Sequence, residues 1–402
     1  MTICIHNGIV LTGLTSNEKR SAVLIEDSKI KDTFSEERFN KMNFGPDIRL
    51  IDAKGNYIIP GLIDTHIHGF KGNGTDDCTT EGILQMSKDL AQYGVTAFNP
   101  TMYSSSKEDM KAKLRAIAAA MGHEEGAKIM GVHLEGPFIS PDKLGVQRPE
   151  TVKLPDIKLF DELWEASEGH IVNMTVAPEL KGMRELALHC IEKGIILQAG
   201  HTNAEYENIV EGIQVGILHS THFFNAMSQL HHRNPGAVGA ILIHPEMSCE
   251  IIADGVHVHP DLFKLLSRDK NRAQIVLVTD ALTPTEQKGE HLFANGEEVV
   301  FKDGCFHRKA DDVIAGSSLT MKKAIKNIVQ YGYPLSDAIK FACVNPARIM
   351  KYAHKGIIAP TYDSDILVMD KGRLLAHGPY DEIVSSCEYF KRICEIRFGR
   401  SV

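Results

Sequence analysis

The sequence lacks any close pair of cysteines. Its eight cysteines are spread over 402 residues, and none forms a C-x-x-C pair. Cysteines at short spacing are typical of structural metal sites, redox motifs and the disulfide frameworks of small secreted domains. In a chain of this length, isolated cysteines indicate free thiols in a reducing compartment, so we expect a cytoplasmic protein.

Long apolar runs and an excess of basic residues are also absent. No apolar run reaches the roughly 18 residues that a membrane-spanning helix needs, so we expect no membrane partner. Residues 1–10 lack the basic start and long apolar core of a signal peptide, and we expect none. The formal net charge is −8 and the lysines and arginines are scattered, which argues against a nucleic-acid partner.

Short apolar runs recur along the middle of the chain. Most of them are separated by stretches with the spacing of amphipathic helices. The eight runs are YIIPGLIDTH, GVTAFNPT, IMGVHLEG, VNMTVAPE, IILQAGHT, HSTHFFNA, SCEIIADG and QIVLVTDA. Strands that alternate with helices predict an α/β fold with a parallel sheet, and eight such units predict a TIM-like (β/α)8 barrel. A doubly wound open sheet is the structural alternative.

The two ends of the chain differ from the middle. Residues 1–53 hold short strand-like pieces with turn residues between them, and SDILVMDKGRLLAHG has the same character. Neither end could build a core alone, so we predict that they pair into one small β-sandwich domain. The predicted boundaries are 1–53 and 356–402 for this domain, with a helical extension after about residue 378, and 54–355 for the barrel.

Acids and imidazoles stand at the ends of six of the eight runs. In a barrel the chemistry lies at the carboxyl ends of the strands, so we expect these side chains to meet at one mouth. They are His66 and His68, Glu135, His201, His222, Asp254 with His257, and Asp280. Charged groups gathered in one poorly solvated site are costly unless they are paired or bind a metal.

His66 and His68 allow two interpretations. Residues two apart on a strand share a face, so these imidazoles are either a satisfied polar pair in the core or half of a metal site. The acids and imidazoles on the other strands favour the metal site. Imidazole and carboxylate ligands without cysteine suit Zn²⁺ or Fe²⁺, and manganese and cobalt accept the same ligands.

The residue types also indicate roles. Glu135, His201 and His222 form a His2Glu set that leaves a coordination position for water. His66 and His68, with a bridging carboxylate, could hold a second ion, so one or two divalent metals are expected. Asp280, alone at the end of the last strand, suits a general base that takes a proton from water and then delivers it to the leaving group.

The motifs at these strand ends resemble those of the amidohydrolase superfamily. In order they are HLEGPF, AGHTNA, THFFNAM with RNPG, ADGVHV and VTDA, and they most resemble the N-acetylglucosamine-6-phosphate deacetylases. The resemblance covers most of the chain. It implies metal-dependent hydrolysis of the acetamide of N-acetyl-D-glucosamine 6-phosphate to D-glucosamine 6-phosphate and acetate, with metal-activated water attacking the carbonyl. By that resemblance Glu135, His201 and His222 bind the main metal, and Asp280 is the catalytic base and then acid.

The resemblance also implies substrate contacts. Asn225, Ala226 and the AGSSLTM loop around Leu319 correspond to residues that contact the sugar in relatives. Arg233 and His257 correspond to residues that meet the 6-phosphate. In relatives one or both of these come from the neighbouring subunit, which implies a homodimer with Arg233 or His257 contributed across the interface.

Alternatives stay open within the resemblance. Gln147 stands where some relatives have a histidine that contacts sugar hydroxyls, so N-acetylgalactosamine 6-phosphate or another N-acyl amino sugar is an alternative substrate. Members that lack a pair like His66 and His68 hold one metal, whereas this chain allows two. A non-catalytic sugar-phosphate sensor is the remaining alternative, and its signature would be the loss of Asp280 or of a metal ligand.

Overall fold

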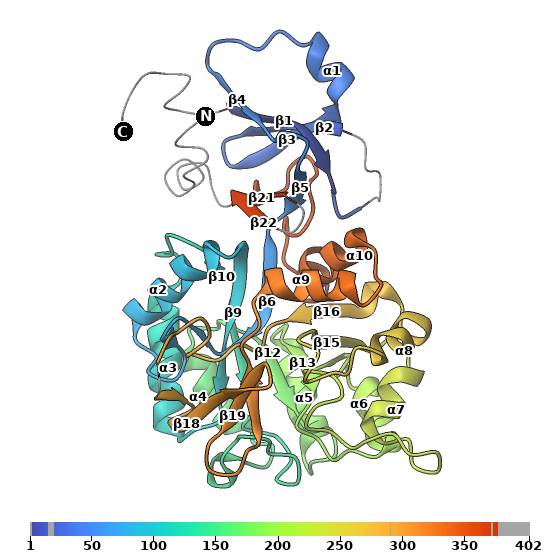
Figure 1. Cartoon of the computed structure of the whole chain (residues 1–402). Helices are drawn as coiled ribbons and strands as arrows, with labels where there is room; N and C mark the ends of the chain where they lie inside the picture. The colour runs from blue at the N-terminus through green and yellow to red at the C-terminus, as the bar shows by residue number, and fades with distance from the viewer. Residues whose placement is uncertain (1, 15–19, 290, 371–372, 377–402) are drawn as a thin grey trace.

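Eight parallel strands form a barrel in the computed structural model, which describes residues 2–14, 20–289, 291–370 and 373–376 (Figure 1). The strands follow one another around the barrel in chain order. They are β6 (Leu62–Ile67), β9 (Val95–Tyr103), β11 (Val132–Glu135), β12 (Ile171–Val176), β13 (Ile196–Ala199), β14 (His219–Ser220), β15 (Ser248–Ile252) and β16 (Ile275–Val278). Each overlaps one of the eight predicted runs, so the predicted barrel is confirmed over the open sheet.

The barrel closes where the first strand meets the last. The N–H of Asp280 donates to the carbonyl of His66 over 2.9 Å. The carboxylate of Asp64 accepts from the N–H and the hydroxyl of Thr279 at 3.2 and 2.6 Å. Burial outweighs these hydrogen bonds and raises the pKa of Asp64 to about 7. These contacts hold the ends of β6 and β16 side by side, and with them the side chains of His66 and Asp280.

Helices cover the outside of the barrel (Figure 1). They are α2 (Thr80–Ala91), α3 (Lys107–Ala120), α4 (Ile157–Ala166), α5 (Met183–Glu192), α6 (Tyr206–Gln214), α7 (Gly236–Ile243), α8 (Leu262–Asp269), α9 (Met321–Gln330), α10 (Leu335–Ile339) and α11 (Asn345–Ile349). Thr79, Ser106 and Asp156 accept backbone N–H groups at the starts of α2, α3 and α4. Gly94 and Gly194, which follow the ends of α2 and α5, have φ of +87° and +83°. Among the described helices, none has the length and apolar character that crossing a membrane requires.

The two ends of the chain meet in a seven-stranded sheet beside the barrel (Figure 1). Its strands are β1 (Thr2–Val10), β2 (Arg20–Glu26), β3 (Lys29–Ser35), β4 (Ile48–Asp52), β5 (Tyr57–Pro60), β21 (Ile366–Asp370) and β22 (Arg373–Ala376), and α1 (Glu36–Lys41) lies against it. β21 pairs antiparallel with β5, which confirms a small β domain built from both chain ends. The boundaries 1–53, 54–355 and 356–402 stay a prediction, and the extension after residue 378 lies outside the described residues.

A four-stranded antiparallel sheet follows the last barrel strand, and the strand rhythm did not predict it. It consists of β17 (Leu292–Ala294), β18 (Glu297–Lys302), β19 (Cys305–Arg308) and β20 (Ile314–Ser317). Asn295–Gly296 and Asp303–Gly304 join consecutive strands, and all four residues have positive φ. Asn-Gly and Asp-Gly are the strongest short signals of two-residue hairpin turns, so the sequence did carry the information.

Candidate active site

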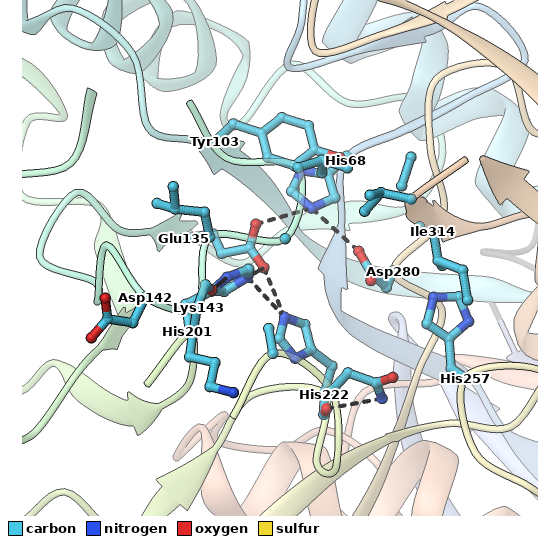
Figure 2. Close-up of a pocket in the computed structure, with 18 residues that line it drawn as sticks. His68, Tyr103, Glu135, Asp142, Lys143, His201, His222, His257, Asp280 and Ile314 are labelled. Carbon is cyan, nitrogen blue, oxygen red and sulfur yellow. Dashed lines mark hydrogen bonds and ion pairs between the residues drawn. The ribbon is translucent and has the colours of Figure 1, made fainter. Parts of the chain in front are cut away.

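A cavity of about 430 Å³ lies at the carboxyl ends of the barrel strands. Figure 2 shows acids and imidazoles converging on it from separate strands and loops. The predicted site residues that line it are His68, Glu135, His201, His222, Asn225, Ala226, His257 and Asp280. His66 lies just beneath them, in contact with Glu135 and Asp280. The carboxyl ends of β6, β11 and β16 and the loops after β13, β14 and β15 therefore supply one site, as the strand ends predicted.

Glu135, His201 and His222 form one group able to hold a metal ion. Oε1 of Glu135 lies 3.3 Å from Nε2 of His201 and 3.2 Å from Nε2 of His222. The two Nε2 atoms are 3.1 Å apart. The Nδ1–H of His201 donates to the carbonyl of Lys143 over 2.8 Å, which leaves the Nε2 lone pair facing the group.

His66, His68 and Asp280 form a second such group beside the first. Oδ1 of Asp280 lies 3.5 Å from Nε2 of His66 and 3.3 Å from Nε2 of His68. Glu135 joins the groups, because its Oε1 is 3.4 Å from Nε2 of His66 and its Oε2 is 3.5 Å from Nε2 of His68. The four predicted histidine ligands and the predicted general base thus gather around the carboxylate of Glu135, the fifth predicted ligand.

The donor set fits a divalent cation better than a hydrogen-bonded core. Nε2 of His66 is buried and has no hydrogen-bond partner among the described residues. The Nδ1 atoms of His66 and His68 are already engaged, by the carboxylate of Glu250 at 2.9 Å and the carbonyl of Thr101 at 3.0 Å. Both Nε2 atoms therefore face carboxylate oxygens, and these contacts need a proton or a cation between nitrogen and oxygen.

Opposite charges govern the protonation of this cluster. Burial lowers the pKa of His66, but the carboxylates of Glu250 and Asp280 outweigh it and hold that pKa well above its usual value. Burial raises the pKa of Glu135 and of Asp280, yet the charges of His201 and His66 hold both pKa values below the usual range. The acids are ionised, and imidazolium supplies the positive charge that a divalent ion would otherwise bring.

The backbone is left-handed at three of the site residues. His201, His222 and Asp280 have φ of +45°, +24° and +50°. A residue with a side chain adopts this conformation at a cost of order 1–3 kcal/mol, and it persists only where the surroundings impose it. Each of the three stands two residues beyond the end of a barrel strand, where the left-handed turn directs its side chain toward the cavity.

Gln147 does not line the cavity, although the sequence predicted a contact with the substrate. It is buried behind Glu135, and its Nε2 donates to Oε2 of Glu135 over 2.9 Å. Its Oε1 accepts from the N–H of Ser104 over 3.0 Å. Because both ends of the amide are engaged by the protein, contact between Gln147 and a sugar stays a prediction.

Leu319 and Arg233 also lie outside the lining of the cavity. Leu319 is 1% exposed and packs in the barrel core. Residues 313–316, at and just before β20 of the four-stranded sheet, form part of the cavity wall instead. Arg233 is exposed on the loop before α7, where its Nη1 lies 2.9 Å from Nε2 of His232. Their predicted contacts with substrate stay predictions for the single chain.

Tyr103 and Lys143 line the cavity without having been predicted. The ring of Tyr103 stacks on His68, with centroids 3.8 Å apart and planes at 4°. Tyr103 is the last residue of β9, two residues beyond Thr101, where the predicted run ends. Extending that run by one two-residue period of the strand would have included Tyr103. Lys143 comes from the loop after β11, where no strand periodicity guides prediction, and it makes no ion pair within the described ranges.

Proteins similar to this chain match most of its length. The profile of the amidohydrolase family matches residues 57–396. N-acetylglucosamine-6-phosphate deacetylase from Bacillus subtilis is 31% identical over 389 residues, covering 95% of this chain and 93% of the relative. N-acetylgalactosamine-6-phosphate deacetylase from Escherichia coli is 29% identical, covering 81% and 86%. A mutant Mycobacterium smegmatis N-acetyl-D-glucosamine-6-phosphate deacetylase in complex with N-acetyl-D-glucosamine-6-phosphate has a TM-score of 0.83 at 25% identity, covering 94% and 97%. The chain belongs to the amidohydrolase family.

Proposed function

We propose that this chain hydrolyses the acetamide of N-acetyl-D-glucosamine 6-phosphate to D-glucosamine 6-phosphate and acetate. The observation that carries the proposal is the convergence of two metal-capable groups on Glu135, with Asp280 beside them at an open cavity. Amide hydrolysis needs an activated water, a polarised carbonyl and a proton for the leaving nitrogen. Relatives that match most of the chain carry the names of amino-sugar-phosphate deacetylases, which supports this substrate class.

The metal cofactor is part of the proposal. Members of the amidohydrolase family generally depend on divalent metals, and the two groups offer the ligands. A bound cation supplies a Lewis acid for the acetamide carbonyl and lowers the pKa of water. We infer one or two ions, zinc or iron first and manganese or cobalt as alternatives, because the donors are imidazole and carboxylate without thiolate. The ligands would be Glu135, His201 and His222, and then His66, His68 and Asp280.

Asp280 is the proton carrier in this proposal. Its carboxylate begins ionised because the charges of His66 and His68 outweigh burial and lower its pKa. It takes a proton from water as the water oxygen bonds to the acetyl carbon. It then gives that proton to the nitrogen as the C–N bond breaks, so the sugar keeps the amine and the acetyl group leaves as acetate.

The cavity wall supports recognition of a phosphorylated sugar. Nδ1 of His257 donates a hydrogen bond to Oδ2 of Asp254 over 2.6 Å, which leaves Nε2 to donate to an anionic group in the cavity. Burial lowers the pKa of His257, but Asp254 outweighs burial and raises it, so the imidazole favours positive charge. We infer that His257 meets the 6-phosphate and that Asn225 and Ala226, in the same wall, contact the sugar.

Arg233 supports a homodimer. It is exposed and lies outside the cavity of its own chain, so it would meet a phosphate only across an interface. Leu230 and Ile243, before and at the end of α7, are 55% and 58% exposed and offer apolar surface near the Arg233 loop. We infer that Arg233 of one subunit completes the phosphate site of the other. The buried, unpaired cysteines of the described residues support a cytoplasmic location.

The proposed role of Asp280 is tested by Asp280→Asn. We expect kcat for acetate release to fall about 10²- to 10⁴-fold, the usual contribution of acid–base catalysis, while the Glu135 group still binds its ion. The matched control is Asp261→Asn, because Asp261 is 69% exposed and pairs only with surface groups. A near-normal kcat in Asp280→Asn would contradict the assignment.

A second substrate has one observation in its favour, which is the Escherichia coli relative named for the galactosamine isomer. Comparing kcat/KM for N-acetylglucosamine 6-phosphate, N-acetylgalactosamine 6-phosphate and free N-acetylglucosamine separates the candidates. A large loss without phosphate supports His257 and Arg233 as phosphate contacts. Binding of these sugars without turnover of any of them would instead favour a non-catalytic sensor.

A further inference from the structure

A carboxylate that the proposed chemistry does not use lies beneath the metal-capable groups. Glu250 of β15 is 0% exposed. Its Oε2 lies 2.9 Å from Nδ1 of His66 and accepts from the N–H of His222 at 3.3 Å. Its Oε1 accepts from Nε2 of Gln198 at 2.7 Å. A buried carboxylate is costly unless it is fully paired, and here every partner belongs either to the site or to the polar interior of the barrel.

A chain of hydrogen bonds fixes the direction of these contacts. The hydroxyl of Tyr352 donates to Oδ1 of Asn99 at 2.6 Å, and Nδ2 of Asn99 donates to Oδ1 of Asn173 at 3.1 Å. Nδ2 of Asn173 then donates to Oε1 of Gln198 at 2.6 Å. Each amide accepts at its oxygen and donates from its nitrogen, so the chain runs one way and ends as a donor to Glu250.

The contacts of Glu250 determine the tautomer of His66. Both oxygens of Glu250 already accept, Oε1 from Gln198 and Oε2 from the N–H of His222, so Nδ1 of His66 is the nitrogen that donates to Oε2. In the neutral ring the lone pair then lies on Nε2, which is 3.4 Å from Oε1 of Glu135 and 3.5 Å from Oδ1 of Asp280. A carboxylate on the outer nitrogen of a metal-binding histidine orients the ring and raises its basicity.

Among the four histidines of the two metal-capable groups, His66 alone is supported by a carboxylate from outside the groups within the described residues. Nδ1 of His68 and Nδ1 of His201 bond to backbone carbonyls, those of Thr101 and Lys143. Nδ1 of His222 is buried without a hydrogen-bond partner among the described residues. A change at Glu250 therefore bears on the His66 group and leaves the side-chain contacts of the Glu135 group in place.

We propose that Glu250 is a positioning residue that holds His66 with its proton on Nδ1 and so enables the group of His66, His68 and Asp280 to bind an ion. The inference rests on the proposed metal dependence and adds to it a determinant of the second ion. The Glu135 group binds its ion without Glu250.

The test is metal titration of Glu250→Gln. The introduced amide would have one acceptor oxygen where Glu250 has two. Its NH₂ group would therefore face another donor, either Nε2 of Gln198 or the N–H groups of His66 and His222. We expect the affinity for one of two Zn²⁺ ions to fall about 10- to 100-fold and the other affinity to stay unchanged. Calorimetric titration of the metal-free protein measures both affinities, and elemental analysis after dialysis measures how many ions remain bound. The control is Tyr352→Phe, which removes a hydroxyl from the far end of the same chain and should leave both affinities unchanged.

Two results would overturn the proposal: Glu250→Gln that keeps both ions at the original affinity, or an unsubstituted protein that takes up a single Zn²⁺. If Glu250→Gln fails to fold, ¹⁵N-histidine NMR of the unsubstituted zinc-loaded protein decides. A proton on Nδ1 of His66 is expected, and a proton on Nε2 would overturn the proposal. Deacetylase assays of the unsubstituted protein test the proposed function separately. If that protein shows no turnover while Glu250→Gln shows the expected loss of metal affinity, the proposed function is rejected and the role of Glu250 is kept.

Discussion

The two metal-capable groups differ in what supports them. In the Glu135 group, Nδ1 of His201 donates to the carbonyl of Lys143, and Nδ1 of His222 has no hydrogen-bond partner in the described part of the chain. In the second group, Nδ1 of His66 is hydrogen-bonded to the buried carboxylate of Glu250, close to where β6 meets β16. A backbone carbonyl is present whatever the sequence, whereas a carboxylate is not. A single change at Glu250, inside the barrel, is therefore expected to weaken the second group without altering any of its ligands.

The largest effect is expected where the two groups meet. Glu135→Gln weakens a ligand that both groups share, so we expect both ions to be lost and turnover to fall at least about 10²- to 10⁴-fold. Elemental analysis and acetate release measure these losses. Glu162→Gln is the control, because Glu162 pairs with Lys107 and Lys111 at the surface. Retention of one full ion in Glu135→Gln would show that the groups are independent.

A difference between the groups is expected from matched histidine changes. His201→Asn removes a ligand of the Glu135 group, and His68→Asn removes one of the second group. If the Glu135 group holds the main ion, His201→Asn should lower kcat/KM by at least tenfold more, about 1.4 kcal/mol in activation free energy. If both variants lose kcat/KM equally and also lose equal amounts of metal, the two groups act as one site.

Lowering the pH should weaken metal uptake. Burial opposes charge on His66 and His201, but the neighbouring carboxylates outweigh it and raise the pKa of both. In the metal-free protein these imidazoles keep their protons to higher pH than an ordinary histidine does, and the protons must leave before the nitrogens coordinate. Apparent affinity should therefore rise with pH, and calorimetry in buffers of different protonation enthalpy should detect proton release. Uptake that is unchanged between about pH 6 and 8 would show that the imidazoles are already neutral.

The sequence predicted the barrel and the gathering of the ligands for the same physical reason. Apolar runs broken by helical spacing predict parallel strands, and parallel strands that close into a barrel end at one mouth. Residues at those ends, such as His201 and Asp280, could be placed without any knowledge of their contacts. Glu250 could not, because it stands inside the apolar run SCEIIADG and its partner His66 belongs to a strand far away in the sequence.

Residues in loops were harder to place than residues on strands. Gln147 was assigned to the substrate by its position in the resemblance, yet its amide is turned toward Glu135. Which way a loop side chain turns depends on contacts that only the folded chain supplies, such as the N–H of Ser104. Arg233 was placed in the same way, and in the single chain it lies exposed beside His232, outside the lining of the cavity.

Gln147 gives the smallest expected effect and separates the two roles that it could have. Its Nε2 donates to both the carbonyl and Oε2 of Glu135, at 3.1 and 2.9 Å, so it restrains one oxygen of one ligand. Gln147→Met keeps the length and removes the hydrogen bonds, and we expect metal affinity to fall about tenfold with KM for the sugar phosphate unchanged. A raised KM with unchanged metal affinity would instead support direct contact with the sugar. Because Oε2 is the oxygen nearest to His68, the loss should be larger for the second group than for the first.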